Sequence, residues 1–239
     1  MSRRPEPVRP PSGYSRGVTD VHSTAAPFLP PRPTLPALRR AAEICTGCDL
    51  HHLGTRTVFG EGPRDARLML VGEQPGDRED REGHPFVGPA GRLLDRALDR
   101  AGIARDDVYL TNVVKHFRWE ARGKRRIHRK PSLSQIAACR PWLDAEIATI
   151  RPEMLVCLGA TAARALLGSS FLVTQRRGEI LDVDGVDPRV TATVHPSAIL
   201  RAPDEGRERE EAAFVRDLSV AVRAMSSPAR GPSATRRSA

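Results

Sequence analysis

The chain has 239 residues and a formal net charge of +9 at pH 7, which favours a polyanion such as nucleic acid as its partner. No apolar run approaches the roughly 20 residues that a membrane span requires, and no apolar segment follows Arg3 and Arg4. We therefore expect a cytoplasmic protein that makes no contact with a membrane.

Both ends of the chain are rich in Pro, Arg and Ser and poor in large apolar residues. Such segments cannot bury enough surface to offset the entropy lost on ordering. We expect disordered tails over residues 1–36 and 226–239, with one domain over residues 37–225 between them. Because nothing in the sequence suggests an obligate assembly, a monomer is expected.

Short apolar runs alternate along the chain with segments of helical periodicity. In chain order, the predicted helices cover residues 35–43, 90–101, 132–150, 160–167 and 204–224. Buried strands are predicted at residues 67–72, 107–110, 153–159 and 190–194, with a weaker one at 179–183. This alternation predicts a three-layer α/β/α fold with a central, mainly parallel four-stranded sheet.

The strand at residues 107–110 leads into Asn112 and then into a strongly basic stretch. Ligands of open α/β sheets bind at the carboxyl ends of the strands. The segment from Lys115 to Lys130 carries eight Lys and Arg residues against a single acid and includes two aromatic residues, Phe117 and Trp119. This mixture suits phosphate contacts and base stacking, although an ordinary solvated basic loop is an alternative.

The cysteines are placed so that some of them can share a metal centre. Cys45 and Cys48 form a C-x-x-C pair, for which a redox pair and chance spacing are the rival interpretations. Cys157 lies inside a predicted strand and is better explained as a small buried hydrophobe. If Cys139 on the long helix joins the pair, His116 is the best-placed fourth ligand, and the set would suit either an iron–sulfur cluster or zinc.

From about residue 45 to residue 218 the chain resembles the family 4 uracil-DNA glycosylases and, within that superfamily, the UdgX type. The shared motifs are C-x-x-C (45–48), GEQPG (72–76), PFVGxAG (85–91), TNVVK (111–115), CxPWL (139–143) and HPSxxLR (195–201). Gln74 replaces the Ala of ordinary family 4 members, and His116 replaces a cluster cysteine. An inserted loop that ends in KRRIH (124–128) follows. The resemblance implies a [4Fe-4S] cluster with four protein ligands: Cys45, Cys48, His116 and Cys139.

Uracil excision requires that the nucleotide leave the base stack and that its Watson–Crick edge be read. The amide of Asn112 offers one donor and one acceptor, which complement uracil N3–H and O4 but not cytosine, although it can also simply cap a turn. Phe86 can stack on the base or pack in the core. Gly72 and Gln74 supply backbone groups to the base, and the Glu73 carboxylate can stabilise an oxocarbenium-like sugar or orient a nucleophile.

His195 follows the last predicted strand and can donate a hydrogen bond near O2 of the departing uracil anion. Ser197, Leu200 and Arg201 come next, and we expect them to enter the duplex, with Leu200 or Arg201 filling the vacated space. A helix N-cap is the alternative role for Ser197.

In the UdgX type, the histidine that ends KRRIH attacks C1′ of the deoxyribose itself. By that match His128 forms a covalent link to DNA, and Lys124, Arg125 and Arg126 clamp adjacent phosphates. The prediction is a glycosylase that excises uracil from single-stranded DNA, with double-stranded DNA as a second candidate substrate, and remains attached to the product. A conventional glycosylase that releases an abasic site and a non-enzymatic, zinc-stabilised nucleic-acid-binding module are the alternatives.

Overall fold

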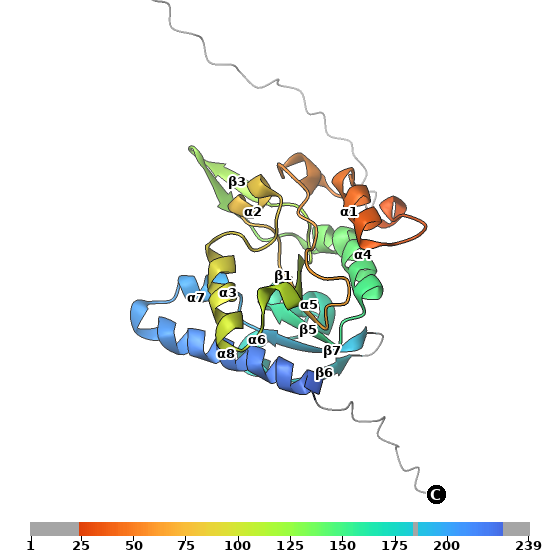
Figure 1. The fold of residues 1–239 in the computed structure, drawn as a ribbon. Helices are drawn as coiled ribbons and strands as arrows, with labels where there is room; N and C mark the ends of the chain where they lie inside the picture. Colours follow the sequence, from red (N-terminus) through yellow and green to blue (C-terminus); the bar gives the residue numbers. More distant parts are fainter. Residues whose placement is uncertain (1–23, 184–185, 227–239) are drawn as a thin grey trace, which may run out of the picture.

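The computed structural model describes residues 24–183 and 186–226, which fold around a sheet of strand order β2-β1-β5-β7-β6 (Figure 1). Its parallel strands are β1 (Leu68–Gly72), β2 (Val108–Asn112), β5 (Met154–Leu158) and β7 (Val186–Thr193). A fifth strand, β6 (Leu181–Val183), pairs antiparallel with β7 at the edge. The mainly parallel sheet is therefore confirmed, with five strands rather than four because the weaker predicted strand also forms.

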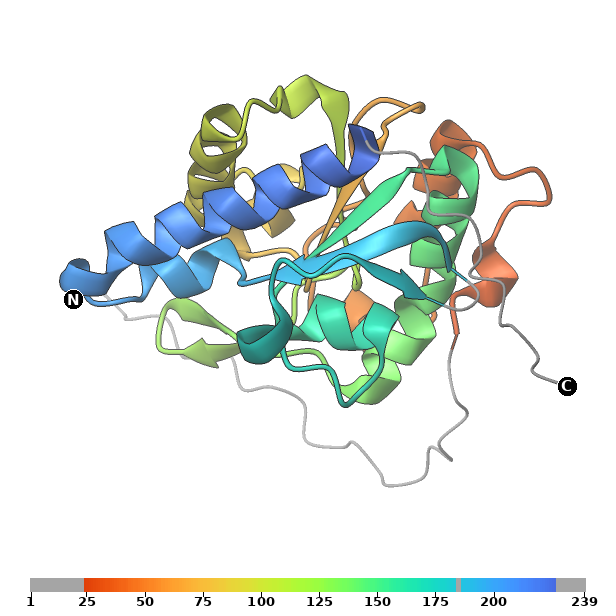
Figure 2. The ribbon, with the colours of Figure 1, turned by 90° about the horizontal axis from the view of Figure 1, so that it is seen from below.

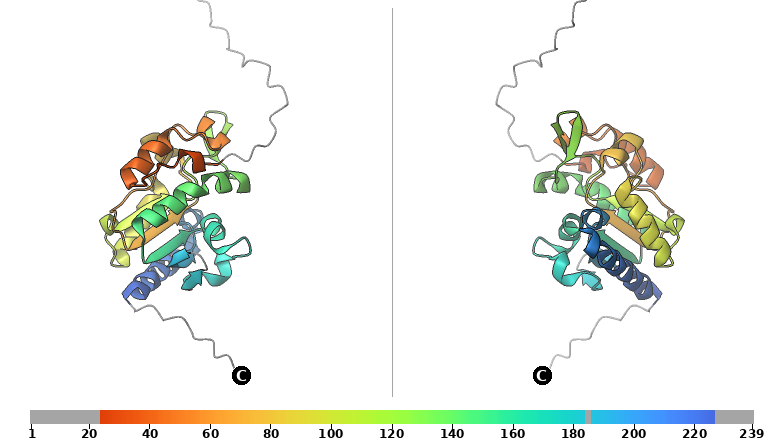
Figure 3. Two further views of the ribbon diagram at one scale, coloured as in Figure 1. Left: turned by 90° about the vertical axis from the view of Figure 1, so that its right-hand side faces the viewer. Right: turned by 90° about the vertical axis from the view of Figure 1, so that its left-hand side faces the viewer.

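Helices cover both faces of this sheet (Figures 2 and 3). Helices α3 (Pro89–Arg100) and α8 (Asp204–Ser226) pack on one face through one apolar cluster. Helices α4 (Leu133–Ile150) and α5 (Ala160–Leu167) pack on the other face through a second cluster. Every residue of β1, β2 and β5 is buried, which is why these strands have continuous apolar runs rather than alternating ones. The predicted three-layer α/β/α fold is confirmed.

Smaller elements complete the described chain. They are η1 (Ala26–Phe28), α1 (Leu35–Glu43), η2 (Asp49–His52), α2 (Asp77–Glu82), η3 (Arg105–Asp107), α6 (Val173–Arg176) and α7 (Pro196–Leu200). Residues 24–36, placed by the sequence in the N-terminal tail, pack against the domain. Ala25 is buried there, and its N–H donates to the Ala138 carbonyl at 2.8 Å. The rest of the predicted tails, residues 1–23 and 227–239, lies outside the described residues. No described helix is long and apolar enough to cross a membrane.

The basic stretch after β2 is a β-hairpin and not an irregular loop. Its strands are β3 (Trp119–Arg122) and β4 (Arg125–His128), and Trp119 pairs with His128. The turn between them contains Gly123 at a φ of 59°, a conformation that glycine adopts without steric cost. In Figure 1 the hairpin extends beyond the body of the fold next to α2.

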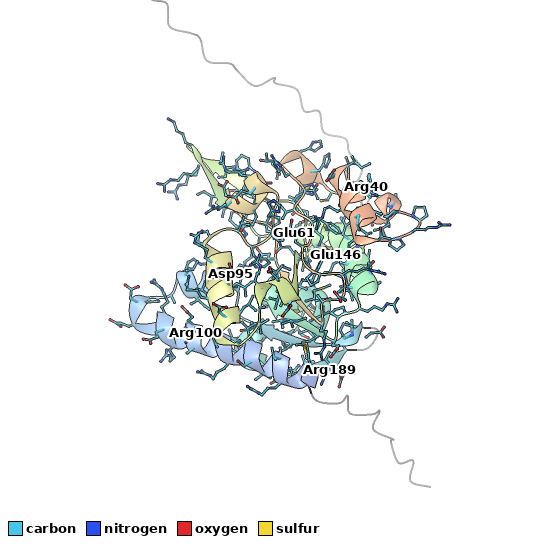
Figure 4. The ribbon with its side chains drawn as sticks, viewed as in Figure 1. Arg40, Glu61, Asp95, Arg100, Glu146 and Arg189 are labelled. Atoms are coloured by element: carbon cyan, nitrogen blue, oxygen red, sulfur yellow. The ribbon has the colours of Figure 1, made fainter. Side chains whose placement is uncertain are left out.

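A buried ion pair fastens the end of β2 to α4. Lys115 is only 1% exposed, and its Nζ lies 2.5 Å from Glu146 Oε2 and 2.8 Å from the Asn112 carbonyl. Glu146 also accepts hydrogen bonds from the Tyr109 hydroxyl and the Gly60 N–H, and Figure 4 shows it in the interior of the fold. The sequence suggested that Lys115 belongs to a basic DNA-binding surface. Because the residue is buried and paired, this expectation is wrong.

Replacing Glu146 with Gln leaves Lys115 as a buried charge without a charged partner. We expect a loss of about 3–5 kcal/mol in the free energy of unfolding, measured by urea titration. Asp144→Asn is the matched control, because it breaks an exposed pair with Arg140 on the same helix and costs about 1 kcal/mol or less. Equal losses in the two variants would contradict this assignment.

Candidate active site

Three predicted base-binding residues converge at the carboxyl end of β1. A Cβ atom placed on Gly72 would lie 2.3 Å from Asn112 Oδ1 and 2.7 Å from Phe86 Cζ. Both side chains therefore rest against the bare backbone of Gly72, and any larger residue would displace them. The structure thus brings the amide of Asn112 and the ring of Phe86 together at Gly72, and their roles in binding the base stay predictions.

Phe86 adopts a backbone conformation that non-glycine residues rarely adopt. Its φ is 57°, and the fold enforces it by close packing, since a Cβ on Gly91 would lie only 1.7 Å from the Phe86 carbonyl oxygen. Backbone of this kind typically costs about 1–3 kcal/mol and is concentrated at functional sites. The ring is 6% exposed and stacks at 6.3 Å, centroid to centroid, with His195. Core packing and a role in the site therefore coexist in this residue.

His195 sits at the N-terminus of α7 with its tautomer fixed by the next turn. The Ser197 N–H donates to His195 Nδ1 at 3.1 Å, so Nδ1 is an acceptor and Nε2 carries the proton. Burial, followed by the charge of Arg201, lowers the pKa of His195 to about 4. The imidazole is consequently neutral at pH 7 and offers an N–H donor. His195 is itself the N-cap of α7, and Ser197, within the first turn, orients its ring.

Glu73 and His128 face each other across the base of the hairpin. Glu73 Oε1 lies 3.5 Å from His128 Nε2, and Thr161 donates a short hydrogen bond to the other carboxylate oxygen. The His128 side chain is 48% exposed and its ring lies 5.9 Å from that of Phe117. Burial lowers the pKa of His128, although the Glu73 carboxylate acts in the opposite direction. The site therefore presents an accessible imidazole supported by a carboxylate.

Gln74 binds the hairpin rather than a pocket for the base. Its Nε2 donates to the carbonyls of Arg118 (3.2 Å) and Arg129 (3.0 Å), and its Oε1 accepts from the Arg118 N–H (3.2 Å). These bonds use the whole amide, and Gln74 is 6% exposed. The side chain therefore holds both strands of the hairpin at their base, and the role expected for the Gln74 backbone in binding the base stays a prediction.

Arg126 is also structural. Its guanidinium donates hydrogen bonds to Asp77 and, at 2.6 Å, to Asp80 Oδ2. The same group lies 5.4 Å from the ring centroids of both Phe117 and Trp119. With two carboxylate partners and a side chain only 13% exposed, it cannot clamp a DNA phosphate as predicted. Phe117 and Trp119 likewise sandwich an internal arginine, which corrects the expectation that they stack on bases.

The other predicted DNA contacts are accessible. Lys124 and Arg125 are exposed at the tip of the hairpin. Leu200, at the end of α7, is half-buried, and Arg201 directly after it is exposed. The charge of Arg201 lowers the pKa of both His128 and His195, which places its guanidinium beside the site.

The four predicted cluster ligands line a single small cavity: Cys45, Cys48, His116 and Cys139. Two N–H groups point at its sulfur atoms. Trp142 Nε1 donates to Cys45 Sγ and the Lys115 backbone N–H donates to Cys139 Sγ, each at 3.3 Å. Burial raises the pKa of the Cys139 thiol to about 12 and lowers that of His116 to about 4. Cys157 does not line this cavity and is buried in β5, as predicted.

Residues 59–219 match the family model of the Uracil DNA glycosylase superfamily. The chain belongs to this superfamily. Among its relatives, the type-4 uracil-DNA glycosylase of Thermotoga maritima is 43% identical over 158 residues, which are 66% of this chain and 78% of the relative. The type-4 uracil-DNA glycosylase of Pyrobaculum aerophilum is 35% identical, over 71% of this chain and 86% of the relative. That of Archaeoglobus fulgidus is 36% identical, over 70% of this chain and 83% of the relative.

In this member of the superfamily, sequence reasoning missed the residues that support the site from a distance. Thr161, at the start of α5, fixes Glu73. Asp80, in α2, is completely buried, receives Arg126, and also accepts the Thr55 N–H at 2.8 Å. Their only sequence signal is proximity to a motif: Thr161 follows the third buried strand and Asp80 follows GEQPG.

Gln74→Leu removes three hydrogen bonds at the base of the hairpin while keeping an apolar stem of similar size. Since each bond stabilises by about 1 kcal/mol, the hairpin should open more often, and trypsin should cleave at Lys124 and Arg125 at least about tenfold faster. Gln175→Leu, on the exposed surface of α6, is the matched control and should leave the cleavage rate unchanged. Unchanged cleavage in Gln74→Leu would show that this amide does not hold the hairpin.

Proposed function

We propose that this protein excises uracil from DNA and captures the resulting deoxyribose through His128. The observation that carries the proposal is the pair formed by Glu73 and His128, which lie 3.5 Å apart. Glu73 directly follows Gly72, and the side chains of Asn112 and Phe86 pack against Gly72. Family membership supports DNA as the substrate and the glycosidic bond as the bond cleaved. The exposed cations at the hairpin tip suit a phosphate backbone.

The first step is recognition of the extruded base. Uracil stacks on Phe86, and the Asn112 amide pairs with O4 and N3–H, which excludes cytosine because its exocyclic amine would face a donor. As the bond between N1 and C1′ breaks, its electron pair passes to uracil. The Nε2–H of neutral His195 then stabilises the charge that develops on O2. Leu200 and Arg201 occupy the space that the nucleotide leaves in the DNA.

The second step is capture of the sugar. With one ring nitrogen of His128 donating to Glu73, the other keeps a lone pair that forms a bond to the electron-deficient C1′. The positive charge that the imidazole gains is neutralised when its remaining N–H proton moves toward the Glu73 carboxylate. Uracil takes a proton from water after it leaves. Water is not a reactant at C1′ in this route, so the protein remains bonded to DNA.

We also propose a [4Fe-4S] cluster in the cavity lined by Cys45, Cys48, His116 and Cys139. The N–H groups aimed at two sulfur atoms suit thiolates, which such donors stabilise. Among the described residues, no three His, Cys, Asp or Glu side chains are close enough to hold one metal ion. Donors spread round a cavity fit a cluster, whose ligands bind different iron atoms, better than a single zinc ion. When bound, the cluster would cross-link the segments that carry its ligands.

The direct test mixes the protein with a uracil-containing single-stranded oligonucleotide and separates the mixture on a denaturing gel. We expect a slow band that survives heat and SDS, in an amount limited by the protein. DNA that is cleaved by alkali and free of protein, formed in excess over the enzyme, would instead establish the conventional glycosylase reaction of the type-4 relatives.

His128→Ser removes the nucleophile and leaves space for a water molecule beside Glu73. We expect this variant to lose the slow band and to release abasic DNA over several turnovers. His84→Ser is the matched control, since His84 is exposed, pairs with Glu61, and should not affect capture. A heat-stable band with His128→Ser would mean that another residue attacks the sugar.

Capture should also depend on pH through His128, because only the neutral imidazole attacks. Since burial lowers its pKa from the ordinary value near 6.5, we expect the rate to be constant from pH 8 to about 7 and to fall below a midpoint under 6.5. Glu73 raises this pKa, so Glu73→Gln should move the fall to lower pH as well as slowing capture. Rapid-quench measurement of the slow band tests both effects, and a rate that rises on acidification would contradict them.

A further inference from the structure

Thr57 lies in the segment between α1 and β1 and connects the cysteine cavity to the end of α1. It lines the same cavity as His116, and its Oγ1 lies 2.9 Å from His116 Nε2. The hydroxyl also donates to the Ala42 carbonyl, at 3.2 Å. A threonine hydroxyl has one hydrogen, and here the Ala42 carbonyl, which can only accept, uses it. With that hydrogen directed at Ala42, Oγ1 acts as the acceptor toward His116.

We propose that Thr57 is a positioning residue that holds His116 in the tautomer protonated at Nε2, so that Nδ1 is the atom that binds the iron–sulfur cluster. This inference rests on the cluster proposed above. A ligating histidine is neutral and has a single N–H, and the partner of that N–H decides which nitrogen keeps the lone pair. With Thr57 accepting at Nε2, the lone pair lies on Nδ1.

The packing around the ring supports this orientation. A Cβ on Gly54 would lie 3.2 Å from His116 Cδ2 and 3.3 Å from His116 Cβ, so the backbone of residue 54 closes one edge of the imidazole. Thr57 occupies the Nε2 position. With these two positions taken, rotation of the ring to exchange its nitrogens would break the hydrogen bond and push against Gly54. His116 is 7% exposed, so water does not readily replace Thr57 as the acceptor.

Two substitutions separate the hydroxyl from the shape of the side chain. Thr57→Val keeps the volume and removes the acceptor, whereas Thr57→Ser keeps the acceptor and removes a methyl group. The wild-type protein must first show bound iron and an absorbance band near 400 nm. If either is absent, the cluster itself is refuted. We then expect Thr57→Val to lose iron to a chelator about tenfold or more faster than wild type, with Thr57→Ser close to wild type. Equal loss rates for Val and wild type, or for Val and Ser, would overturn the role of the hydroxyl.

A second measurement identifies the bonded nitrogen directly. The protein is prepared with histidine carrying ¹⁵N at either Nδ1 or Nε2, the cluster is reduced, and pulsed electron paramagnetic resonance records the nitrogen couplings. The Nδ1-labelled sample should give the larger ¹⁵N coupling. A larger coupling from the Nε2-labelled sample would contradict the proposal, whatever the stability of the cluster in the variants.

Discussion

The buried contact between Lys115 and Glu146 holds together the parts of the molecule on which its chemistry depends. Lys115 Nζ binds the carbonyl of Asn112, so the ion pair fixes the residue that we propose to face the base. The Lys115 N–H donates to Cys139 Sγ, and the next residue is His116. A few consecutive residues at the end of β2 therefore contribute both to the site proposed for the base and to the cysteine cavity. Because breaking such a pair would leave an unpaired charge in the core, the pair resists opening and holds the junction in place.

A second constraint is the way the hairpin is held. A nucleophile is effective only when it is positioned near the reacting carbon, and a free basic loop would not provide this. Here Gln74 binds both strands at their base, and Arg126 ties the hairpin to Asp77 and Asp80 in α2. Much of what looks in the sequence like a surface for DNA is therefore internal support for His128. The exposed cations at the tip are the ones that remain for the proposed phosphate contacts.

The sequence predicted the sheet and the residues that follow its strands, because buried parallel strands are apolar throughout and their carboxyl ends share one edge. Asn112 and His195 were placed at that edge in this way, and the structure has both of them there. The hairpin was not predicted, since its four-residue strands are charged and largely exposed and carry no apolar periodicity. Lys115 and Arg126 were misassigned for a different reason. A charged side chain can be buried only if partners distant in the sequence meet it, and no local pattern reveals them.

The central claim is a bond between His128 and C1′, and mass spectrometry of the captured complex tests it most directly. After nuclease treatment and cleavage of the chain at glutamate, we expect the deoxyribose phosphate remnant on the peptide of residues 121–146, with fragmentation placing it on His128. The remnant on Lys124 or on any other residue, or a protein that carries no remnant at all, would contradict it.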